Sequence, residues 1–270
     1  MNVDILMSCM HQIDDRLVSQ SKLTGNVIVI NQCDNNGYKE FTTKNGVAKI
    51  YSTTDRGLTK SRNIAISKSN ADICMLCDDD EVFVDGYETK ILDAYEKISQ
   101  ADVIIFNMKD RPNPFGDTIK RLRFPNTMKV SSWQISFKRD SLIKNGVRFD
   151  ELLGAGTNNG AEEELKFLTD CEKAGLKIYF CPTEIASVAQ EESTWWQGFN
   201  DQFFINRGAT TRYILGWAIA SVYALYYAVK KRKYYKDGMT VFRAIKYTFK
   251  GIKKNKITKQ AKANYLNSKG

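Results

Sequence analysis

Four consecutive acidic residues, Asp78 to Glu81, follow directly on an apolar stretch that runs from Ala71 to Cys77. The stretch has the length and composition of a buried strand. Folding alone gives no reason to gather carboxylates that repel one another, whereas ligand sites of open α/β sheets lie at the carboxyl ends of strands. A Mg²⁺ or Mn²⁺ ion, held by one or two carboxylates and by substrate phosphates, would relieve the repulsion. We therefore predict a metal–diphosphate site here, with a solvated acidic turn as the alternative.

A second candidate element is Gly57–Asn63, with the sequence Gly-Leu-Thr-Lys-Ser-Arg-Asn. A glycine turn opens a predicted helix whose first turns carry Lys60 and Arg62, so that backbone N–H groups and cations are available to a phosphate. Alone the pattern is weak, because basic residues on a helix usually face solvent. Its place just before the acidic strand makes both residues candidates for binding a phosphate.

The elements that must position these residues alternate between strand and helix patterns, which predicts an α/β fold with a mostly parallel sheet. Strands are predicted at Asp4–Met10, Asn26–Asn31, Ala71–Cys77, Asp102–Met108, Val130–Lys138 and Leu176–Cys181. Helices are predicted at Gly57–Ser69, at Tyr87–Ser99 and over about residues 161–174, and Asp110–Lys129 is predicted to be a loop or an irregular hairpin.

Cysteine use and the N-terminus indicate a reducing, cytosolic setting. Met1–Leu6 has neither a basic start nor a long apolar run, so it predicts a first strand and not a signal peptide. The six cysteines are scattered, and Cys74 and Cys77 have no second pair to complete a zinc site, with His11 the single histidine.

Charge divides the chain near residue 200. Residues 201–270 contain 16 Lys/Arg and 2 Asp/Glu, which leaves 24 basic and 29 acidic residues before them. We predict a catalytic domain over residues 1–200, closing near Thr194–Trp196, and a basic helical appendage over residues 201–270. A basic appendage on an acidic body suggests an anionic partner, either a lipid surface or a nucleic acid.

The appendage has features typical of a membrane-surface segment. Tyr213–Val229 is 17 residues without a charge, and five of them are aromatic. Spanning requires about 20 residues, and positive charge on both sides argues against a simple crossing. A second apolar stripe, surrounded by Lys and Arg, consists of Val241, Phe242, Ile245, Phe249 and Ile252. We predict peripheral or monotopic association with the anionic cytoplasmic face of the cell membrane, with packing of Tyr213–Val229 against the body as the alternative. Nucleic acid is not predicted as a partner, because it would leave the uncharged aromatic stretch unexplained.

The ordered motifs resemble family 2 glycosyltransferases with the GT-A fold. Gly57–Asn63 followed by Ala71–Asp80 looks like that family's Gly-Leu-Ser-x-Ala/Ser-Arg-Asn helix and its strand ending in Asp-x-Asp. Phe149-Asp150-Glu151, Glu162-Glu163-Glu164 and Ala174–Tyr179 are similar to its acceptor-side pattern. The resemblance covers about residues 1–200. It implies a Rossmann-like mixed sheet flanked by helices and a role in bacterial surface-polysaccharide biosynthesis.

The resemblance also implies a reaction and roles for residues. A sugar would move, with inversion, from a nucleotide-sugar such as a UDP-sugar to a hydroxyl of a glycan or lipid-linked acceptor. Asp78 and Asp80 would hold the Mn²⁺ or Mg²⁺ ion, and Glu164 aligns best with the family's general base, with Glu163 the close alternative. Donor-binding residues would be Ser8, Gln32, Asp34, Lys60, Arg62, Asn63, Asp78 and Asp79.

Two positions depart from the family pattern. Where relatives have Asp-Asp-Gly-Ser for base recognition, this chain has Asn31-Gln32-Cys33-Asp34, so base recognition falls to Gln32 or Asp34 or is relaxed. Gln190 stands where many relatives place a histidine near the metal.

Two other functions are alternatives to this one. A sugar-nucleotide-forming nucleotidyltransferase is one, but it would show a glycine-rich loop after the first strand, and Ser8–His11 contains no glycine. A membrane-bound scaffold with vestigial carboxylates is the other, and metal-dependent hydrolysis of a donor would distinguish it from an enzyme.

Overall fold

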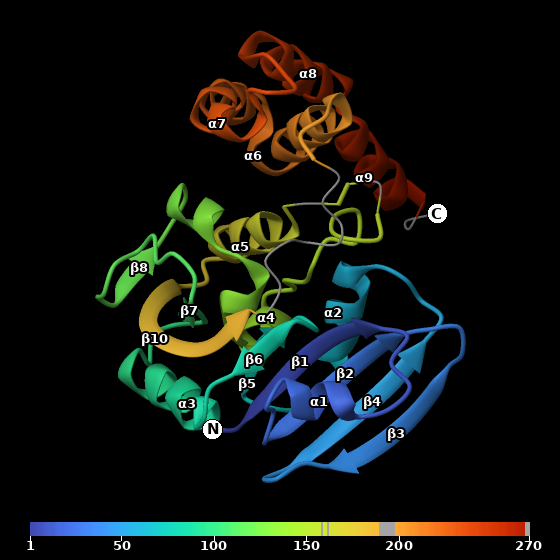
Figure 1. The fold of residues 1–270 in the computed structure, drawn as a ribbon, viewed down its shortest axis with the longest axis vertical. Helices are drawn as coiled ribbons and strands as arrows, with labels where there is room; N and C mark the ends of the chain where they lie inside the picture. Colours follow the sequence, from blue (N-terminus) through green and yellow to red (C-terminus); the bar gives the residue numbers. More distant parts are fainter. Residues whose placement is uncertain (158, 161, 189–197, 268–270) are drawn as a thin grey trace. The chain divides into compact units, whose positions relative to one another are not determined.

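The computed structural model describes residues 1–157, 159–160, 162–188 and 198–267 (Figure 1). The chain forms two compact units. The sheet unit comprises Met1–Glu151 and Glu163–Glu191, and the helical unit comprises Leu152–Glu162 and Glu192–Gly270. The predicted closing segment Thr194–Trp196 lies outside the described residues.

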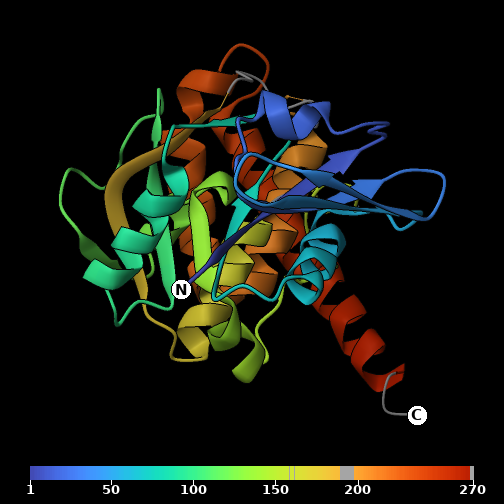
Figure 2. The same cartoon turned by 90° about the horizontal axis from the view of Figure 1, so that it is seen from below.

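The described part of the sheet unit contains one mixed sheet with the strand order β3-β4-β2-β1-β5-β9-β7-β10-β6, and β8 pairs with β10. The strands are β1 (Val3–Met10), β2 (Asn26–Gln32), β3 (Gly37–Thr42), β4 (Val47–Thr53), β5 (Ile73–Cys77), β6 (Glu81–Phe83), β7 (Val103–Lys109), β8 (Lys120–Leu122), β9 (Ile135–Lys138) and β10 (Ile178–Val188). In Figure 2 the blue strands β2, β3 and β4 extend to one side of the unit, and the curved β10 lies at the other.

Alternating side chains of the central strands fill two separate cores. Val3, Ile5 and Met7 of β1 pack with α1 (Arg16–Gln20) and α3 (Tyr87–Lys97) on one face of the sheet. Leu6 of β1 packs with α2 (Leu58–Lys68), α4 (Arg139–Lys144) and α5 (Glu163–Lys173) on the other. Because side chains of a strand point alternately to opposite faces, a continuous apolar run such as that of β1 is typical of a strand covered on both sides.

The central strands β4, β2, β1 and β5 are parallel to one another. Strand order reverses at β1, since the chain continues first to β2 on one side and later to β5 on the other. Ligands of open α/β sheets bind at such switch points, outside the carboxyl ends of the strands. The predicted α/β fold class, with its helical C-terminal region, is confirmed.

Local differences from the predicted elements lie outside this central region. The edge hairpin of β3 and β4 was not predicted. The predicted strand Val130–Lys138 is regular only over β9, because the preceding residues form the short 3₁₀ helix Ser132–Gln134. The predicted loop Asp110–Lys129 contains β8 and a second 3₁₀ turn, Asn126–Lys129.

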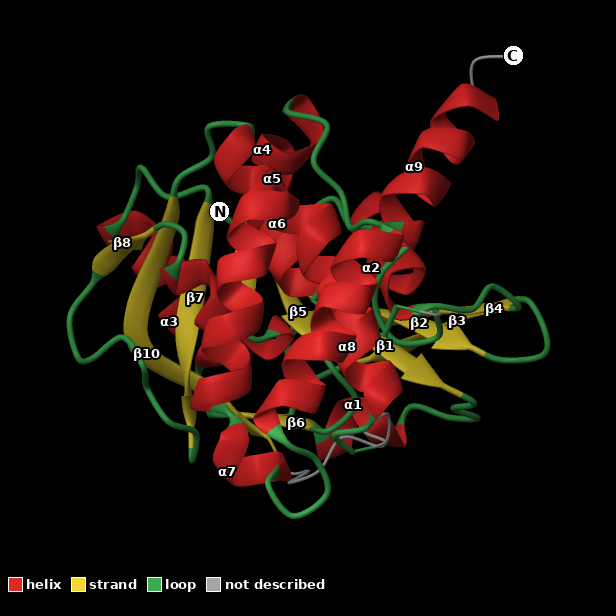
Figure 3. Ribbon diagram, turned by 90° about the horizontal axis from the view of Figure 1, so that it is seen from above, coloured by secondary structure: helices red, strands yellow, loops and turns green. Residues whose placement is uncertain are grey.

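In the helical unit, α6 (Asp201–Lys230) packs against α8 (Val241–Lys254), with α7 (Arg232–Tyr235) between them in the chain. Figure 3 shows α6 and α8 side by side and α9 (Lys256–Asn267) extending away from them. Two glycines permit the close approach of the pair. A Cβ at Gly208 would lie 2.0 Å from the carbonyl oxygen of Thr248, and one at Gly251 would lie 2.0 Å from that of Ile205.

Gly216 interrupts α6 with a positive φ of 79° and divides it into two helical segments that meet at a kink. None of the helices in the described part of the chain combines the length and the apolar character needed to cross a bilayer.

Candidate active site

Arg62 of α2 brings together residues that were predicted from separate motifs. Its side chain is 2% exposed, and its Nη2 donates to Asp78 Oδ1 over 3.0 Å. Its Nη1 lies 3.7 Å from Glu163 Oε1, and its guanidinium carbon lies 5.4 Å from the centre of the Phe149 ring. Burial opposes the positive charge, but the carboxylates of Asp78, Glu163 and Glu164 outweigh it and raise the pKa of Arg62. The guanidinium therefore stays charged between the acidic strand end and the start of α5.

Asp78 is held at both carboxylate oxygens and at its backbone nitrogen. Oδ1 accepts from Arg62, and Oδ2 accepts from Ser132 Oγ over 2.9 Å. The backbone N–H of Asp78 donates to Glu81 Oε1 over 2.7 Å. Burial and the charge of Asp78 raise the pKa of Glu81 well above its ordinary value. These contacts fix the orientation of Asp78 before any ligand binds, which is the preorganisation that an electrostatic site requires.

Asp79 and Asp80 complete the acidic strand end. Burial, followed by the charge of Asp78, raises the pKa of each. In the part of the chain that the structure describes, no group of three or more His, Cys, Asp or Glu side chains is placed to hold a metal ion. Mg²⁺ is commonly held by one or two carboxylates together with substrate phosphates and water. The carboxylate oxygens at this strand end, which are mutually repelling, fit such an ion when the substrate supplies the remaining ligands.

Three predicted donor-binding residues hold α2 in place. Gln32, at the end of β2, accepts from the backbone N–H of Gly57 over 2.7 Å, and Ser8, on β1, accepts from Ser61 Oγ over 2.8 Å. Asn63 exchanges two hydrogen bonds of 2.9 Å with the backbone of Phe149. Ser8 and Gln32 thereby link the strand ends to α2, and Asn63 links α2 to the acceptor-side motif.

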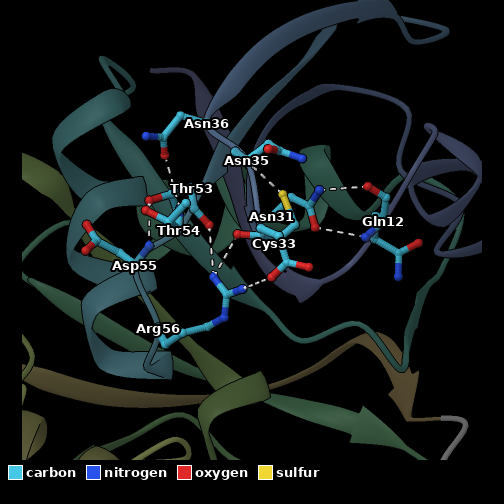
Figure 4. A network of polar contacts seen from close by, with 10 residues as sticks. Gln12, Asn31, Cys33, Asn35, Asn36, Thr53, Thr54, Asp55 and Arg56 are labelled. Carbon is cyan, nitrogen blue, oxygen red and sulfur yellow. Dashed lines mark hydrogen bonds and ion pairs between the residues drawn. The ribbon is translucent and has the colours of Figure 1, made fainter.

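Asp34 and Lys60 each form an ion pair of their own. Figure 4 shows the network around Arg56, whose Nη1 donates to the carbonyl oxygens of Cys33 and Thr53 over 2.8 and 3.2 Å. Arg56 Nη2 also donates to Asp34, over 2.8 Å, and the Asp34 side chain is 81% exposed. Lys60 pairs with Asp55 over 2.6 Å. Asp34 and Lys60 thus pair with Arg56 and Asp55, which precede the glycine turn.

In the same network Asn31 is engaged with the backbone of Gln12 through both of its side-chain atoms, over 2.9 and 2.7 Å. The Asn31 side chain therefore fixes the loop after β1. Gln190 lies outside the described residues.

Three residues of the site were not assigned from the sequence. Glu81 was visible as the last member of the acidic run, but no pattern showed that it would cap the backbone of Asp78. Ser132 carried no signal, since it lies in a segment predicted to be a regular strand. Arg56 directly precedes the glycine turn, and the sequence analysis assigned it no role.

The fold and this site define an α/β protein with an acidic strand end at the switch point of its sheet. The family model described as "Glycosyl transferase family 2" matches residues 11–156, more than half of the chain. The chain belongs to glycosyl transferase family 2. It is therefore a glycosyltransferase of glycan biosynthesis.

Solved structures of S. aureus TarS are similar in fold. TarS 1–349 has a TM-score of 0.56 at 14% identity, with 88% of this chain and 74% of that chain covered. Its complex with UDP has a TM-score of 0.56 at 15% identity, with the same coverage. Its complex with UDP-GlcNAc has a TM-score of 0.56 at 14% identity, covering 83% of this chain and 67% of that one. Of full TarS, 45% is covered. No curated protein matches the sequence.

Proposed function

We propose that this protein transfers a sugar, with inversion, from a UDP-sugar to a hydroxyl of a glycan or lipid-linked acceptor. The observation that carries the proposal is the buried Arg62, which contacts Asp78 on the donor side and Glu163 at the start of the acceptor-side helix α5. The nucleotide is proposed from the similar TarS structures, which were determined with UDP and UDP-GlcNAc.

The donor side of the proposed site is the acidic strand end. Asp80, with Asp78, would hold a Mn²⁺ or Mg²⁺ ion, which neutralises the charge on the departing diphosphate. Asp78 is oriented for this by Arg62 and Ser132. Asp79 and the donor-binding residues Ser8, Gln32 and Asn63 would shape the site through the positions of β1, β2 and α2.

The acceptor side has two adjacent glutamates at the start of α5, and their surroundings differ. Glu163 is 6% exposed and faces Arg62, so its charge is compensated by a buried cation. Glu164 is half-buried. We assign proton removal to Glu164. It would take the proton of the acceptor hydroxyl while that oxygen bonds to the anomeric carbon and the bond to the diphosphate oxygen breaks on the opposite side.

The test is a screen of nucleotide-sugars with the full-length protein, measuring release of nucleoside diphosphate with Mn²⁺ and with chelator. We expect release from one UDP-sugar to be at least tenfold faster with Mn²⁺ than with chelator, and release from GDP-sugars to be slower. Formation of UDP-sugar from UTP and a sugar 1-phosphate would instead support the nucleotidyltransferase alternative. Absence of turnover with every nucleotide-sugar, with and without a lipid extract as acceptor source, would support a scaffold.

We also propose that the helical unit binds an anionic membrane surface, at its cytoplasmic face, through the second segment of α6. There the small residues Ala220, Ala224 and Ala228 are buried. Large apolar residues of the same segment are exposed, and these are Trp217, Ile219, Val222, Leu225, Tyr226 and Val229. Water-soluble helices usually bury their large apolar residues, and exposed apolar patches mark interaction sites. Lys230 to Lys233 follow the segment directly and would favour anionic lipid.

The stripe predicted on α8 is not part of this surface, because most of it packs inside the helical unit. Val241 and Ile245 pack with one cluster of α6 residues, and Ile252 and Phe249 pack with another. Only Phe242 of the predicted stripe is largely exposed, at 78%.

Membrane binding predicts that the full chain cosediments with vesicles containing phosphatidylglycerol. Val222→Glu combined with Leu225→Glu should reduce binding at least tenfold, because the apolar area that would enter the interface is lost. Charge reversal of the four basic residues at 230–233 should reduce it as well, at about 1 kcal/mol per residue, and raised salt should mimic that loss in part. The control reverses four exposed lysines of the sheet unit, namely Lys22, Lys44, Lys97 and Lys177. Equal losses in control and test variants would contradict the proposal.

A further inference from the structure

The motif Phe149-Asp150-Glu151 contacts two helices of the sheet unit, α2 and α5. The Phe149 side chain is fully buried, and its ring stacks on that of Phe167 in α5, with centroids 4.3 Å apart and 6° between the planes. On α2, the guanidinium carbon of Arg62 lies 5.4 Å from the centre of the same ring. One side chain of the motif therefore contacts both Arg62 and α5.

The backbone of Phe149 is fixed as well. Its N–H donates to Asn63 Oδ1, and its carbonyl oxygen accepts from Asn63 Nδ2, both over 2.9 Å. Asn63 Nδ2 also donates to Glu151 Oε1 over 3.1 Å. Because the oxygen and the nitrogen of the Asn63 amide are both engaged by the motif, Asn63 holds residues 149–151 against α2.

Asp150 gives the motif a second contact with α5. Its Oδ2 lies 3.8 Å from Lys166 Nζ, and the two side chains are 16% and 15% exposed. Lys166 also pairs with Asp170, one turn further along the same helix. A rotation of α5 about its axis, or a shift along it, would break the ion pair or the ring stack, since packed side chains leave little room for adjustment.

Phe167 lies one turn after the two glutamates at the start of α5. Glu163 and Glu164 precede it by four and three residues, and residues at these spacings are neighbours on a helix surface. Glu163 Oε1 lies 3.7 Å from Arg62 Nη1. The contact of Phe167 with Phe149 therefore helps to set how far the first turn of α5 lies from Arg62.

We propose that Phe149 is a positioning residue for the transfer reaction. Its ring fixes α5, and hence Glu164, relative to Arg62 and the acidic strand end, while Asn63 holds its backbone. The inference rests on the proposed function, which assigns proton removal to Glu164. It gives Asn63 a positioning role in place of the predicted contact with the donor.

The experiment compares full-length Phe149→Leu and Asn63→Asp with wild type. Leucine keeps the position apolar and removes the ring stack, and an aspartate at 63 accepts from the N–H of Phe149 but cannot donate to its carbonyl oxygen. Readouts are the affinity for UDP with Mn²⁺ and the kcat of UDP release from the UDP-sugar with water as acceptor. We expect kcat to fall about 100-fold in Phe149→Leu and about tenfold in Asn63→Asp, with UDP affinity within about twofold of wild type, because a displaced catalytic group affects the reaction and not the binding of UDP.

Two matched controls separate positioning from loss of stability. Phe115→Leu removes a ring from the same core, where Phe115 and Phe180 have centroids 4.9 Å apart. Asn26→Asp makes the same exchange at the start of β2, where Asn26 accepts from the N–H of Val47 over 3.1 Å. Both controls should match wild-type kcat below their melting temperatures. Losses of kcat in the controls equal to those in the test variants would overturn the inference.

A double variant tests whether Phe149 acts through Glu164. If it does, adding Phe149→Leu to Glu164→Gln should lower kcat by less than about threefold, because the base is already absent. Multiplication of the two single losses would overturn the inference. If Phe149→Leu lacks a cooperative thermal transition, Asn63→Asp takes its place in the double variant, and wild-type kcat in Asn63→Asp alone would then overturn the inference.

Hydrogen–deuterium exchange distinguishes failure of this inference from failure of the proposed function. Phe149→Leu should increase amide exchange in peptides covering residues 163–173 beyond any increase seen in Phe115→Leu. That result can be obtained even if no UDP-sugar is turned over, in which case the proposed function fails alone. Equal exchange of these peptides in the two variants would overturn the positioning role whatever the turnover.

Discussion

Replacement of Asp80 by alanine is expected to lower Mn²⁺-dependent UDP release by about a thousandfold or more. A metal that neutralises a leaving group contributes several kcal/mol to the transition state, and each 1.36 kcal/mol corresponds to a factor of ten in rate. Burial, followed by the charge of Asp78, raises the pKa of Asp80, and a bound divalent cation would relieve the repulsion between the two carboxylates. The measurement is kcat for UDP release across a Mn²⁺ titration, with the free energy of unfolding measured in parallel.

The fold should tolerate this change. Asp80 is half-buried and loses repulsion when it is neutralised, so Asp80→Ala and Asp80→Asn should unfold at denaturant concentrations close to that of wild type. Asp93→Ala, on the exposed face of α3, is the matched control and should keep full activity. Undiminished turnover of Asp80→Asn at low Mn²⁺, or full wild-type turnover in chelator, would show that no metal acts at this strand end.

The central strands could be predicted because their patterns report burial directly. β1, β2 and β5 are apolar over nearly their whole length, and a run of that kind has few alternatives to a doubly covered strand. β3 could not be predicted in the same way. Five of its six residues, among them Tyr38, Lys39 and Glu40, are exposed, so its strand conformation comes from pairing with β4 and not from a hydrophobic pattern.

Within the site, the predicted contacts of several residues differ from those in the structure. Arg62 was expected to bind a phosphate. In the structure its guanidinium forms ion pairs with Asp78 and Glu163 inside the protein. Gln32 and Asn63 were chosen for donor binding, and their side chains contact backbone groups of Gly57 and Phe149. Long-range pairs such as Asn63 with Phe149 leave no local pattern, since only the tertiary fold brings the two segments together.

The packing of the C-terminal helices also could not be predicted from local sequence patterns. The spacing of Val241, Ile245, Phe249 and Ile252 correctly predicted an amphipathic helix, but periodicity cannot say what covers an apolar face. Helix α6 covers most of it, and close contact of the two helices depends on Gly208 and Gly251, which carried no signal in the sequence. The exposed apolar residues lie on α6, in the uncharged stretch from which the membrane prediction was made.

Replacement of Glu164 by glutamine is expected to lower kcat by about 10²–10⁴-fold and to leave donor affinity nearly unchanged. General-base assistance contributes a rate factor of this size, and the amide cannot accept the acceptor's proton. An interaction made only in the transition state appears in kcat and kcat/KM together, with little effect on binding. Calorimetry with UDP tests whether the affinity is unchanged, and the rate of UDP release tests whether kcat is lowered.

Glu163→Gln is an informative comparison with Glu164→Gln, because Glu163 forms an ion pair with Arg62. Its carboxylate lies 3.7 Å from a guanidinium that is almost fully buried, so loss of its charge should act first on stability. Removing one partner of a buried ion pair costs up to 3–5 kcal/mol, and here the cost should be smaller because Asp78 still pairs with Arg62. We therefore expect Glu163→Gln to lower the free energy of unfolding by about 1–3 kcal/mol and to keep most of kcat below its melting temperature. A large loss of kcat in Glu163→Gln with full activity in Glu164→Gln would move the base by one residue. Wild-type kcat in both variants would mean that neither glutamate removes the proton.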